Sequence, residues 1–317
     1  VCKYSFGPGN NAALVEQVLK SRPWWTSTDD ENNLRWQQLT PAPMRFCSTM
    51  RRTVFNHLPG NGTLHSKVSL YQILLRKLGK PALDFLPVTY ILTVERDKFR
   101  RHFAALASNL WIVKPIGLNR GRGIKVVTNP EDAIESMSFI VQKYVEEPFL
   151  INGRKFDIRT YALITSDGNA YIYEYGYLRL TSAKYSLDTT DTTVHLTNNA
   201  VQKNIHGYNQ FEDGNMLHFR DLDVQMSVSD DFTSFIWPVM KRIMAAVLVA
   251  FGKAVLGAHA CGCFELFGFD FMISNGYRPI LIEINSNPCL ALSSVVSWEL
   301  LPKMLDDLMD LTIDKLF

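Results

Sequence analysis

Apolar residues recur every three or four positions in several stretches of the chain, a spacing that places them on one face of a helix. Residues 11–21 and 67–78 show this spacing in the N-terminal third. Residues 232–255 predict a longer helix with a break near Pro238. Residues 297–317 predict an amphipathic closing helix. Helices are therefore expected on both sides of a middle region with a different pattern.

That middle region contains apolar runs of strand length between turn signals. Residues 109–115 and 124–128 flank a glycine-rich loop, which predicts two strands joined by that loop. Residues 156–165 and 170–180 flank the sequence Ser-Asp-Gly-Asn at 166–169, a strong hairpin signal. Strand, loop and strand are expected twice in succession.

The clearest hairpin has an Asn-Gly turn at 275–276 between two apolar strands. A two-residue turn places Asp270 opposite Leu281. Because strand side chains alternate between faces, Glu283 and Asn285 then share the face of Asp270. The opposite face is expected to be core, and its residues are Phe269, Phe271, Ile273, Ile280, Ile282 and Ile284.

Two carboxylates and an amide on one face suggest a cation site. The carboxylates would repel each other without a cation, and oxygen ligands of this kind suit Mg²⁺. The alternative is a half-exposed sheet whose polar face meets water.

The loop at 114–124 combines glycines with cationic side chains. Glycines let backbone N–H groups approach phosphate oxygens, and the cations neutralise them. The loop lacks the Gly-Lys-Ser/Thr ending of a Walker motif, and a strand rather than a helix follows it. A polyphosphate cradle and a tight hairpin with exposed arginines both remain open. The residues concerned are Lys114, Arg120, Gly121, Arg122, Gly123 and Ile124.

Lys155, Asp157 and Arg159 alternate along one strand and share a face. This face suits a phosphate or carboxylate ligand, although an exposed salt-bridged strand gives the same pattern. Arg179 on the partner strand points to the other face if the turn has two residues. A bulge near Gly176, or a turn longer by one residue, would bring it to the same face.

Composition limits the class of protein. Of 317 residues, 47% are hydrophobic and 20% charged, and the net charge is +2, so we expect neither a nucleic acid nor a membrane as partner. The apolar run at 244–252 is shorter than the ~20 residues of a membrane span, which predicts a soluble protein. Five cysteines fit a reducing cytosol. The first residue is Val1, which leaves open whether the chain is part of a longer protein.

With these segments in view, residues 55–290 resemble the tubulin-tyrosine ligase and ligase-like family, a branch of the ATP-grasp enzymes. Segments of distinct chemistry match in order: Trp-Ile-Val-Lys-Pro at 111–115, Gly-Arg-Gly-Ile at 121–124, Gln-Lys-Tyr at 142–144, Lys-Phe-Asp-Ile-Arg at 155–159, His-Leu-Thr-Asn at 195–198, Leu-Phe-Gly-Phe-Asp-Phe at 266–271 and Ile-Glu-Ile-Asn at 282–285.

The resemblance implies an α+β fold of ATP-grasp type, with antiparallel sheets and flanking helices in three lobes: 1–105, 106–150 and 151–317. It implies ATP and Mg²⁺ as cofactors. The implied nucleotide site is Lys114, Arg120, Gly121, Arg122, Gly123, Ile124, Gln142, Lys143, Tyr144, Val145, Lys155, Asp157, Thr197 and Asn198. The implied catalytic residues are Arg159, Arg179 and Glu283, and the implied metal ligands are Asp270, Glu283 and Asn285.

The resemblance also implies ligation of a free amino acid to a protein carboxylate through an acyl-phosphate, on tubulin or another protein with an acidic tail. Basic clusters at 96–102 and at Arg45, Arg51, Arg52, Arg76, Lys77 and Lys80 would meet that tail, although each cluster alone could equally be an ordinary solvated helix face. A monomer in the cytoplasm, cytoskeleton or cilium is expected.

The added amino acid stays open. Residues 207–215 are similar to the tyrosine-adding member and 198–203 to the glycine-adding members, and glutamylation or glycylation is weakly favoured over tyrosination. Two alternatives also remain: a nucleotide-binding pseudoenzyme that acts as a microtubule adaptor, and a small-molecule carboxylate–amine ligase.

Overall fold

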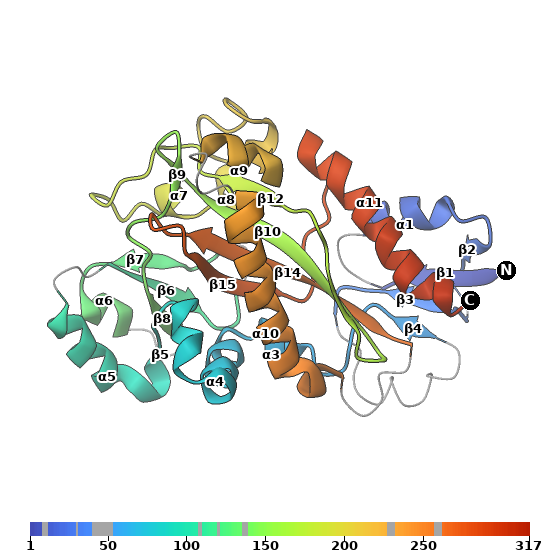
Figure 1. The fold of residues 1–317 in the computed structure, drawn as a ribbon, viewed down its shortest axis with the longest axis horizontal. Coiled ribbons are helices and arrows are strands. Elements are labelled where there is room, and N and C mark those ends of the chain that lie inside the picture. The colour runs from blue at the N-terminus through green and yellow to red at the C-terminus, as the bar shows by residue number, and fades with distance from the viewer. Residues whose placement is uncertain are drawn as a thin grey trace.

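A computed structural model describes residues 1–7, 12–29, 31–39, 53–106, 110–118, 121–134, 139–226, 232–256 and 262–317. These residues form a mixed fold of helices and three sheets (Figure 1). The strands are β1 Cys2–Phe6, β2 Trp25–Ser27, β3 Leu34–Trp36, β4 Val54–Phe55, β5 Thr89–Ile91, β6 Trp111–Pro115, β7 Lys125–Val127, β8 Phe139–Lys143, β9 Leu150–Ile151, β10 Arg154–Thr165, β11 Ala170–Ile172, β12 Tyr177–Leu180, β13 Met216–His218, β14 Phe264–Ile273 and β15 Pro279–Asn285. The helices are α1 Ala12–Lys20, α3 Gly62–His65, α4 Lys67–Leu78, α5 Leu92–Ala105, α6 Pro130–Ile134, α7 Thr192–His195, α8 Asn199–Gln202, α9 Phe219–Gln225, α10 Trp237–Leu256 and α11 Val295–Leu311, with the short turns η1 Lys80–Asp84, η2 Asp213–Asn215, η3 Phe232–Ile236 and η4 Ile313–Lys315.

The largest sheet carries most of the polar residues of interest. Its order is β13-β12-β10-β14-β15, and β9 and β11 also pair with β10. Every pair in it is antiparallel. The long strands β10 and β14 are buried along their whole length. Charged side chains on these two strands are therefore interior groups and need partners.

The second sheet, here called the central sheet, is antiparallel with the order β5-β8-β6-β7. Its strands β6 and β7 are those predicted around the glycine loop. Helix α5 packs on it, with the rings of Phe99 and Trp111 5.1 Å apart between centroids. Both β5 and α5 precede the lobe boundary expected at 105/106, and the lobe division itself stays a prediction.

The N-terminal sheet, β2-β1-β3-β4, was not predicted. All of its pairs are parallel, whereas antiparallel sheets were expected. Its strands have only two to five residues, too few to show an alternating pattern. A buried contact connects the end of β4 to the large sheet: His57 Nδ1 lies 2.8 Å from Glu265 Oε1.

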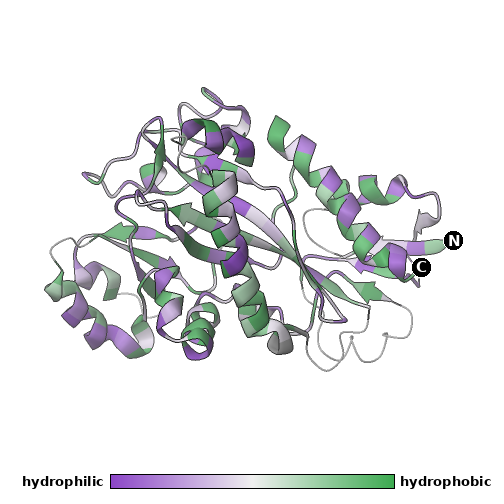
Figure 2. Ribbon diagram, viewed as in Figure 1, coloured by the Kyte–Doolittle hydropathy of each residue, from purple (hydrophilic) through white to green (hydrophobic). Residues whose placement is uncertain are grey.

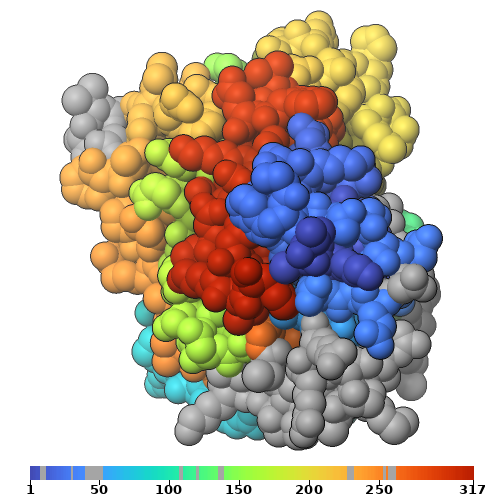
Figure 3. All heavy atoms as spheres, turned by 90° about the vertical axis from the view of Figure 1, so that its right-hand side faces the viewer, coloured from blue at the N-terminus to red at the C-terminus, as the bar shows by residue number. Residues whose placement is uncertain are grey.

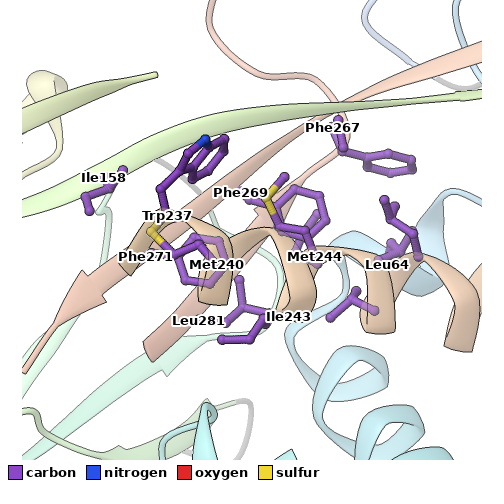
Figure 4. Close-up of a cluster of buried hydrophobic side chains, with 14 of the residues drawn as sticks. Leu64, Ile158, Trp237, Met240, Ile243, Met244, Phe267, Phe269, Phe271 and Leu281 are labelled. Carbon is purple, nitrogen blue, oxygen red and sulfur yellow. The ribbon is translucent and has the colours of Figure 1, made fainter. Parts of the chain in front are cut away.

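Helix α10 covers one face of the large sheet, where Met240 and Met244 pack against Phe269 and its neighbours (Figure 4). Within the described residues, Phe232–Gly252 is long and apolar enough to cross a membrane by length and composition. The sequence interpretation considered only the run at 244–252. A buried core helix passes the same test, so this single stretch is weak support for a membrane span.

Helix α11 packs on the N-terminal sheet, and the two lie side by side on one face of the molecule (Figure 3). Its apolar and polar residues alternate in bands, as predicted for an amphipathic helix (Figure 2). Three carboxylates near the C-terminal end surround the buried Arg22: Asp306 at 2.6 Å, Asp310 at 2.8 Å and Asp314 at 2.7 Å. The first and last segments of the chain therefore share one core.

Candidate active site

The turn between β14 and β15 is wider than two residues. The backbone N–H of Ser274 donates to the carbonyl of Arg278 at 3.0 Å. Tyr277 adopts a φ of 59°, a left-handed conformation that tight turns require. The predicted two-residue turn at 275–276 is thus wrong, and the strands pair one position further along.

A second irregularity follows in the same hairpin. The register shifts between Asp270 and Phe271, with Phe271 opposite Leu281 and Asp270 opposite Glu283, so that Ile282 is the extra residue of a β-bulge. Asp270 was predicted to face Leu281. The wide turn alone would invert the two faces, and the bulge inverts them back. The predicted shared face is therefore confirmed, although by a different register.

The bulge also changes which residues of β15 reach the core. Leu281 and Ile284 lie in the core under α10. Ile280 and Ile282, which were predicted to be core, are only half-buried.

The acidic residues have cationic neighbours on the adjacent strands. Asn285 Nδ2 lies 3.4 Å from Asp270 Oδ2 and 3.3 Å from Glu283 Oε1. Arg159 donates to both Asp270 oxygens, at 2.5 and 3.0 Å, and Arg179 Nη2 lies 2.9 Å from Oδ2. Burial raises the pKa of Asp270, but the two guanidinium groups outweigh it and lower that pKa. The two arginines thus offset the repulsion between the carboxylates, which was expected to require a bound cation.

Arg179 shares a face with Arg159, and the longer turn, one of the two proposed causes, accounts for it. Thr165 N donates to Asn169 O at 3.0 Å, so the turn after β10 has three residues. The chain is also irregular before β12, where a side chain at Gly176 would lie 2.4 Å from the carbonyl oxygen of Arg159. The three-residue turn places Arg179 on the face of Arg159. The irregularity before β12 shifts the pairing with β10 by two positions, which leaves that face unchanged.

Together these residues form an arginine–aspartate cluster of Arg159, Arg179, Asp157 and Asp270. Arg179 donates two hydrogen bonds to Asp157, at 2.7 and 2.6 Å. Thr197 Oγ1 donates to the same carboxylate at 2.6 Å. Two cations are thus matched by two anions in the interior, the arrangement that buried charges require.

The glycine loop folds toward residues 196–201. Gly121 and Gly123 have φ of 77° and 69°. A side chain at Gly121 would lie 3.1 Å from Val201 Cγ2 and 3.3 Å from Asn198 Oδ1. Glycine is therefore needed for close approach as well as for the left-handed backbone. Arg120 lies outside the described residues.

A cavity of about 860 Å³, part of it open to solvent, lies between the central and large sheets. Its lining comes from β6, the glycine loop, β8, β10, the 195–198 segment and the acidic hairpin. The lining residues are Lys67, Pro87, Ile112, Lys114, Pro115, Leu118, Gly121, Arg122, Ile124, Gln142, Lys143, Tyr144, Val145, Lys155, Asp157, His195, Leu196, Thr197, Asn198, Asp270, Met272, Ile282 and Glu283.

Two buried lysines give this cavity its charge. Burial lowers the pKa of Lys114 to about 8, partly opposed by Glu283. Burial lowers the pKa of Lys155 to about 7, partly opposed by Asp157 and aided by Lys114. An anion bound between the two lysines would favour their charged forms.

Lys155 belongs to a lysine network with Tyr144 and His195. Its Nζ donates to Tyr144 Oη at 2.7 Å and to the backbone carbonyl of His195 at 2.8 Å. Tyr144 Oη lies 2.8 Å from His195 Nδ1, and His195 Nε2 lies 2.7 Å from the carbonyl of Thr189. Burial lowers the pKa of His195, so the neutral imidazole is favoured.

Gln142 and Lys143 differ in how far the polar atoms of their side chains are already hydrogen-bonded. Gln142 Nε2 donates to Thr89 Oγ1 at 2.9 Å. Its buried Oε1 has no hydrogen-bond partner among the described residues. Lys143 donates to Glu146 and, at 3.1 Å, to the carbonyl of Leu110. Gln142 thus offers a free acceptor to a ligand, whereas the ammonium of Lys143 is already engaged.

Comparison with known proteins identifies the family. The family model for the tubulin-tyrosine ligase family matches residues 44–316. The chain belongs to this family. The resemblance inferred from the sequence motifs is therefore confirmed, and the mixed fold agrees with it.

Curated relatives within the family modify tubulin according to their names. The chain is 29% identical to the probable tubulin polyglutamylase TTLL2 of Homo sapiens, over 94% of this chain and 54% of the relative. It is 31% identical to the tubulin polyglutamylase TTLL5 of Mus musculus, over 94% and 24%. It is 33% identical to the tubulin glycylase 3B of Tetrahymena thermophila, over 78% and 22%. The chain thus spans about half, or less, of the length of these relatives.

Most residues that the family resemblance implied line this cavity. Four described ones do not: Gly123, Asn285, Arg159 and Arg179. Sequence reasoning missed Lys67, whose Nζ donates to the glycine-loop carbonyl of Leu118 at 3.2 Å. It precedes the apolar residues of α4 and carries no motif of its own. Pro87, Leu118 and Met272, which also line the cavity, likewise belong to none of the matched segments.

The predicted metal ligands lie together on the β14–β15 hairpin. Within the described part of the chain, no group of three or more His, Cys, Asp and Glu side chains could hold a metal ion. Asp270, Glu283 and Asn285 are two carboxylates and an amide, which is a donor set that Mg²⁺ accepts. Asn285 turns its NH₂ group to both carboxylates.

Proposed function

We propose that the chain is the catalytic part of an ATP- and Mg²⁺-dependent ligase with an ATP-grasp arrangement of its sheets. The reaction joins the amino group of a free amino acid to a protein carboxylate. The observation that carries this proposal is the cavity between the two antiparallel sheets, with buried lysines along its walls and carboxylates at one end. Polyphosphate needs the lysines, and a divalent cation needs the carboxylates.

The nucleotide is proposed to lie along the cavity from β8 to the hairpin. The orphaned Gln142 Oε1 would accept a hydrogen bond from the adenine amino group. Lys114 and Lys155 would bind phosphate oxygens. Lys67, which lines the same cavity beside the glycine loop, would add a third cation.

The acidic end of the cavity is proposed to hold Mg²⁺ through Asp270, Glu283 and Asn285. Bound there, Mg²⁺ would neutralise phosphate charge during transfer. The amide of Asn285 would have to present its oxygen instead of its nitrogen. Arg159 and Arg179, which both pair with Asp270, would meanwhile keep it deprotonated and oriented.

The chemistry requires no nucleophilic side chain. An oxygen of the acceptor carboxylate attacks the γ-phosphorus of ATP and ADP leaves, which gives an acyl-phosphate. The amine then attacks the acyl carbon, phosphate leaves and the amine gives up a proton. In this scheme the protein positions the reactants and stabilises negative charge. Arg159 and Arg179 are proposed to neutralise the acceptor and the acyl-phosphate, for which they would share their N–H groups between these and their partners Asp157 and Asp270.

Tubulin is the proposed acceptor, because the relatives are named for tubulin polyglutamylation and glycylation. Glutamate or glycine is favoured over tyrosine as the added amino acid. An acidic tail would meet the basic residues of α4 and α5. Arg100 is already paired with Glu131 at 2.9 Å, so Arg76, Lys77 and Lys80 are the more available cations, and Arg45, Arg51 and Arg52 lie outside the described residues. A monomer in the cytoplasm, on the cytoskeleton or in cilia is proposed.

Incubation with ATP, tubulin and each labelled amino acid tests the proposal. Incorporation of label from glutamate or glycine is expected, and it should be lost in Glu283→Gln. No incorporation from any amino acid would reject tubulin ligation. Full incorporation by Glu283→Gln would reject the catalytic role of the hairpin.

A further inference from the structure

The lysine network has a feature that the proposed reaction does not use, namely a fixed direction of hydrogen bonding. The Thr189 carbonyl can only accept, so Nε2 of His195 carries a proton. In the neutral imidazole Nδ1 then has no proton and must accept. The hydroxyl of Tyr144, 2.8 Å away, is the donor. The order of donation is therefore Lys155 to Tyr144, Tyr144 to His195, and His195 to Thr189.

This order limits the freedom of the Lys155 ammonium. An ammonium has three N–H groups. One is held by Tyr144 Oη at 2.7 Å and one by the backbone carbonyl of His195 at 2.8 Å. Among the described residues the third has no protein partner, and Lys155 lines the cavity. His195 thus holds the ammonium twice, directly by its carbonyl and indirectly by its ring.

We propose that His195 is a positioning residue that acts through Tyr144 to aim the free N–H of Lys155 at an anionic oxygen of the bound nucleotide. This inference rests on the proposed function, because it takes the nucleotide as the ligand of the cavity. It assigns to the His195 ring a role in affinity without contact between that ring and the nucleotide. The role depends on the neutral ring, since an imidazolium cannot accept from Tyr144 and would repel Lys155.

Nucleotide affinity should therefore fall on both sides of neutral pH. Acid protonates His195 and breaks the order of donation. Alkali removes the charge of Lys155, whose pKa burial has lowered to about 7 in the free protein. The titratable and charged groups around the network also contribute, and they are Lys114, Glu146, Asp157, Tyr185 and Asp191.

Three single variants and one double variant test the inference, with the Mg²⁺ complex of a non-hydrolysable ATP analogue as the probe. Tyr144→Phe keeps the ring and removes the relay hydroxyl, and His195→Leu removes the acceptor. Each should weaken binding by about 5- to 10-fold, the value of one ordinary hydrogen bond. The double variant should bind no more weakly than about 10-fold, because both changes break the same path.

His195→Asn provides the matched control. Its amide oxygen can still accept from Tyr144, but it does not titrate. Binding within about twofold of the parent protein at neutral pH is expected, together with loss of the decrease at acid pH. That pH readout does not depend on whether His195→Leu folds, and unfolding midpoints will show which variants do.

The outcomes separate this inference from the proposed function. If the parent chain does not bind the analogue, both fail. If it binds, and Tyr144→Phe and His195→Leu bind as tightly or their costs multiply in the double variant, only the positioning role fails. An unchanged acid decrease in His195→Asn also rejects it.

Discussion

Two groups of buried cations each have a member on strand β10, Arg159 in one and Lys155 in the other, and they are stabilised in opposite ways. In the arginine–aspartate cluster each guanidinium has a carboxylate partner within 3 Å. In the lysine network the direct partners of Lys155 are a hydroxyl and a carbonyl, which are neutral dipoles. Burial is the largest influence on pKa in both places.

The pKa shifts of Arg159 and Lys155 have opposite directions because only the arginine–aspartate cluster contains compensating charge. Asp270 raises the pKa of Arg159 despite burial, and the arginines lower the pKa of Asp270. The cluster is therefore charged throughout the physiological range. Lys155 instead loses its proton near neutral pH in the absence of ligand. The arginine–aspartate cluster is thus always charged, whereas the charged form of Lys155 would be stabilised by a bound anion.

The largest effect is expected from Asp270→Asn. It leaves two buried guanidinium groups with one carboxylate, which should lower the free energy of unfolding by about 3–5 kcal/mol. Urea unfolding in the presence of a chelator measures this without a metal contribution. The exposed Asp188→Asn is the control, with a change below about 0.5 kcal/mol. Equal stability of the two variants would mean that the cluster is not a charge-balanced unit.

A smaller loss is expected from Arg179→Lys. Lysine keeps the charge but cannot donate two parallel hydrogen bonds to Asp157 and a third to Asp270. The expected cost is about 2 kcal/mol by urea unfolding, against little change for the exposed Arg220→Lys. A parent-like stability would show that charge alone, without the fork geometry, maintains the cluster.

The smallest effect at neutral pH is expected from Lys155→Met, because the lysine has no dedicated anion there. The unfolded chain keeps the Lys155 proton up to about pH 10, whereas the folded chain loses it near pH 7. The parent protein therefore gains stability relative to the variant as pH rises from 7 to 10, by about 1.4 kcal/mol per pH unit. Paired unfolding curves at several pH values measure this difference. A constant difference, as expected for the exposed Lys203→Met, would contradict it.

The polar face of the hairpin was predictable, although its register was not. Alternation alone placed Glu283 and Asn285 together, since they lie on one strand. Whether Asp270 shares their face depended on the length of the turn and on a bulge, each of which shifts the strand register by one residue. Neither has a sequence signal that a single chain reveals, and the two errors cancelled. For Arg179, a two-residue turn would have placed the side chain on the face opposite Arg159. That conflict correctly indicated an irregular connection between the two strands.

What the sequence could not supply were contacts between distant segments. Lys67 reaches the glycine loop from α4, and Tyr144 meets His195 across 51 positions of chain. The short parallel strands at the N-terminus had too few residues for any period to appear. Motifs thus found most of the charged residues of the site, whereas Lys67 and the hydrogen bonds that join Lys155, Tyr144 and His195 required the fold.

The contact of α11 with the N-terminal sheet has a consequence for synthesis. Tyr4, Leu14 and Trp36 share a core with Leu301 and Met304. A ribosome releases the first of these long before the last, so the N-terminal segment must wait through most of translation without its apolar partner. Contacts of such sequence separation form late and slowly. Until α11 is synthesised, these apolar side chains of the nascent N-terminal segment are without the partners that cover them in the folded protein.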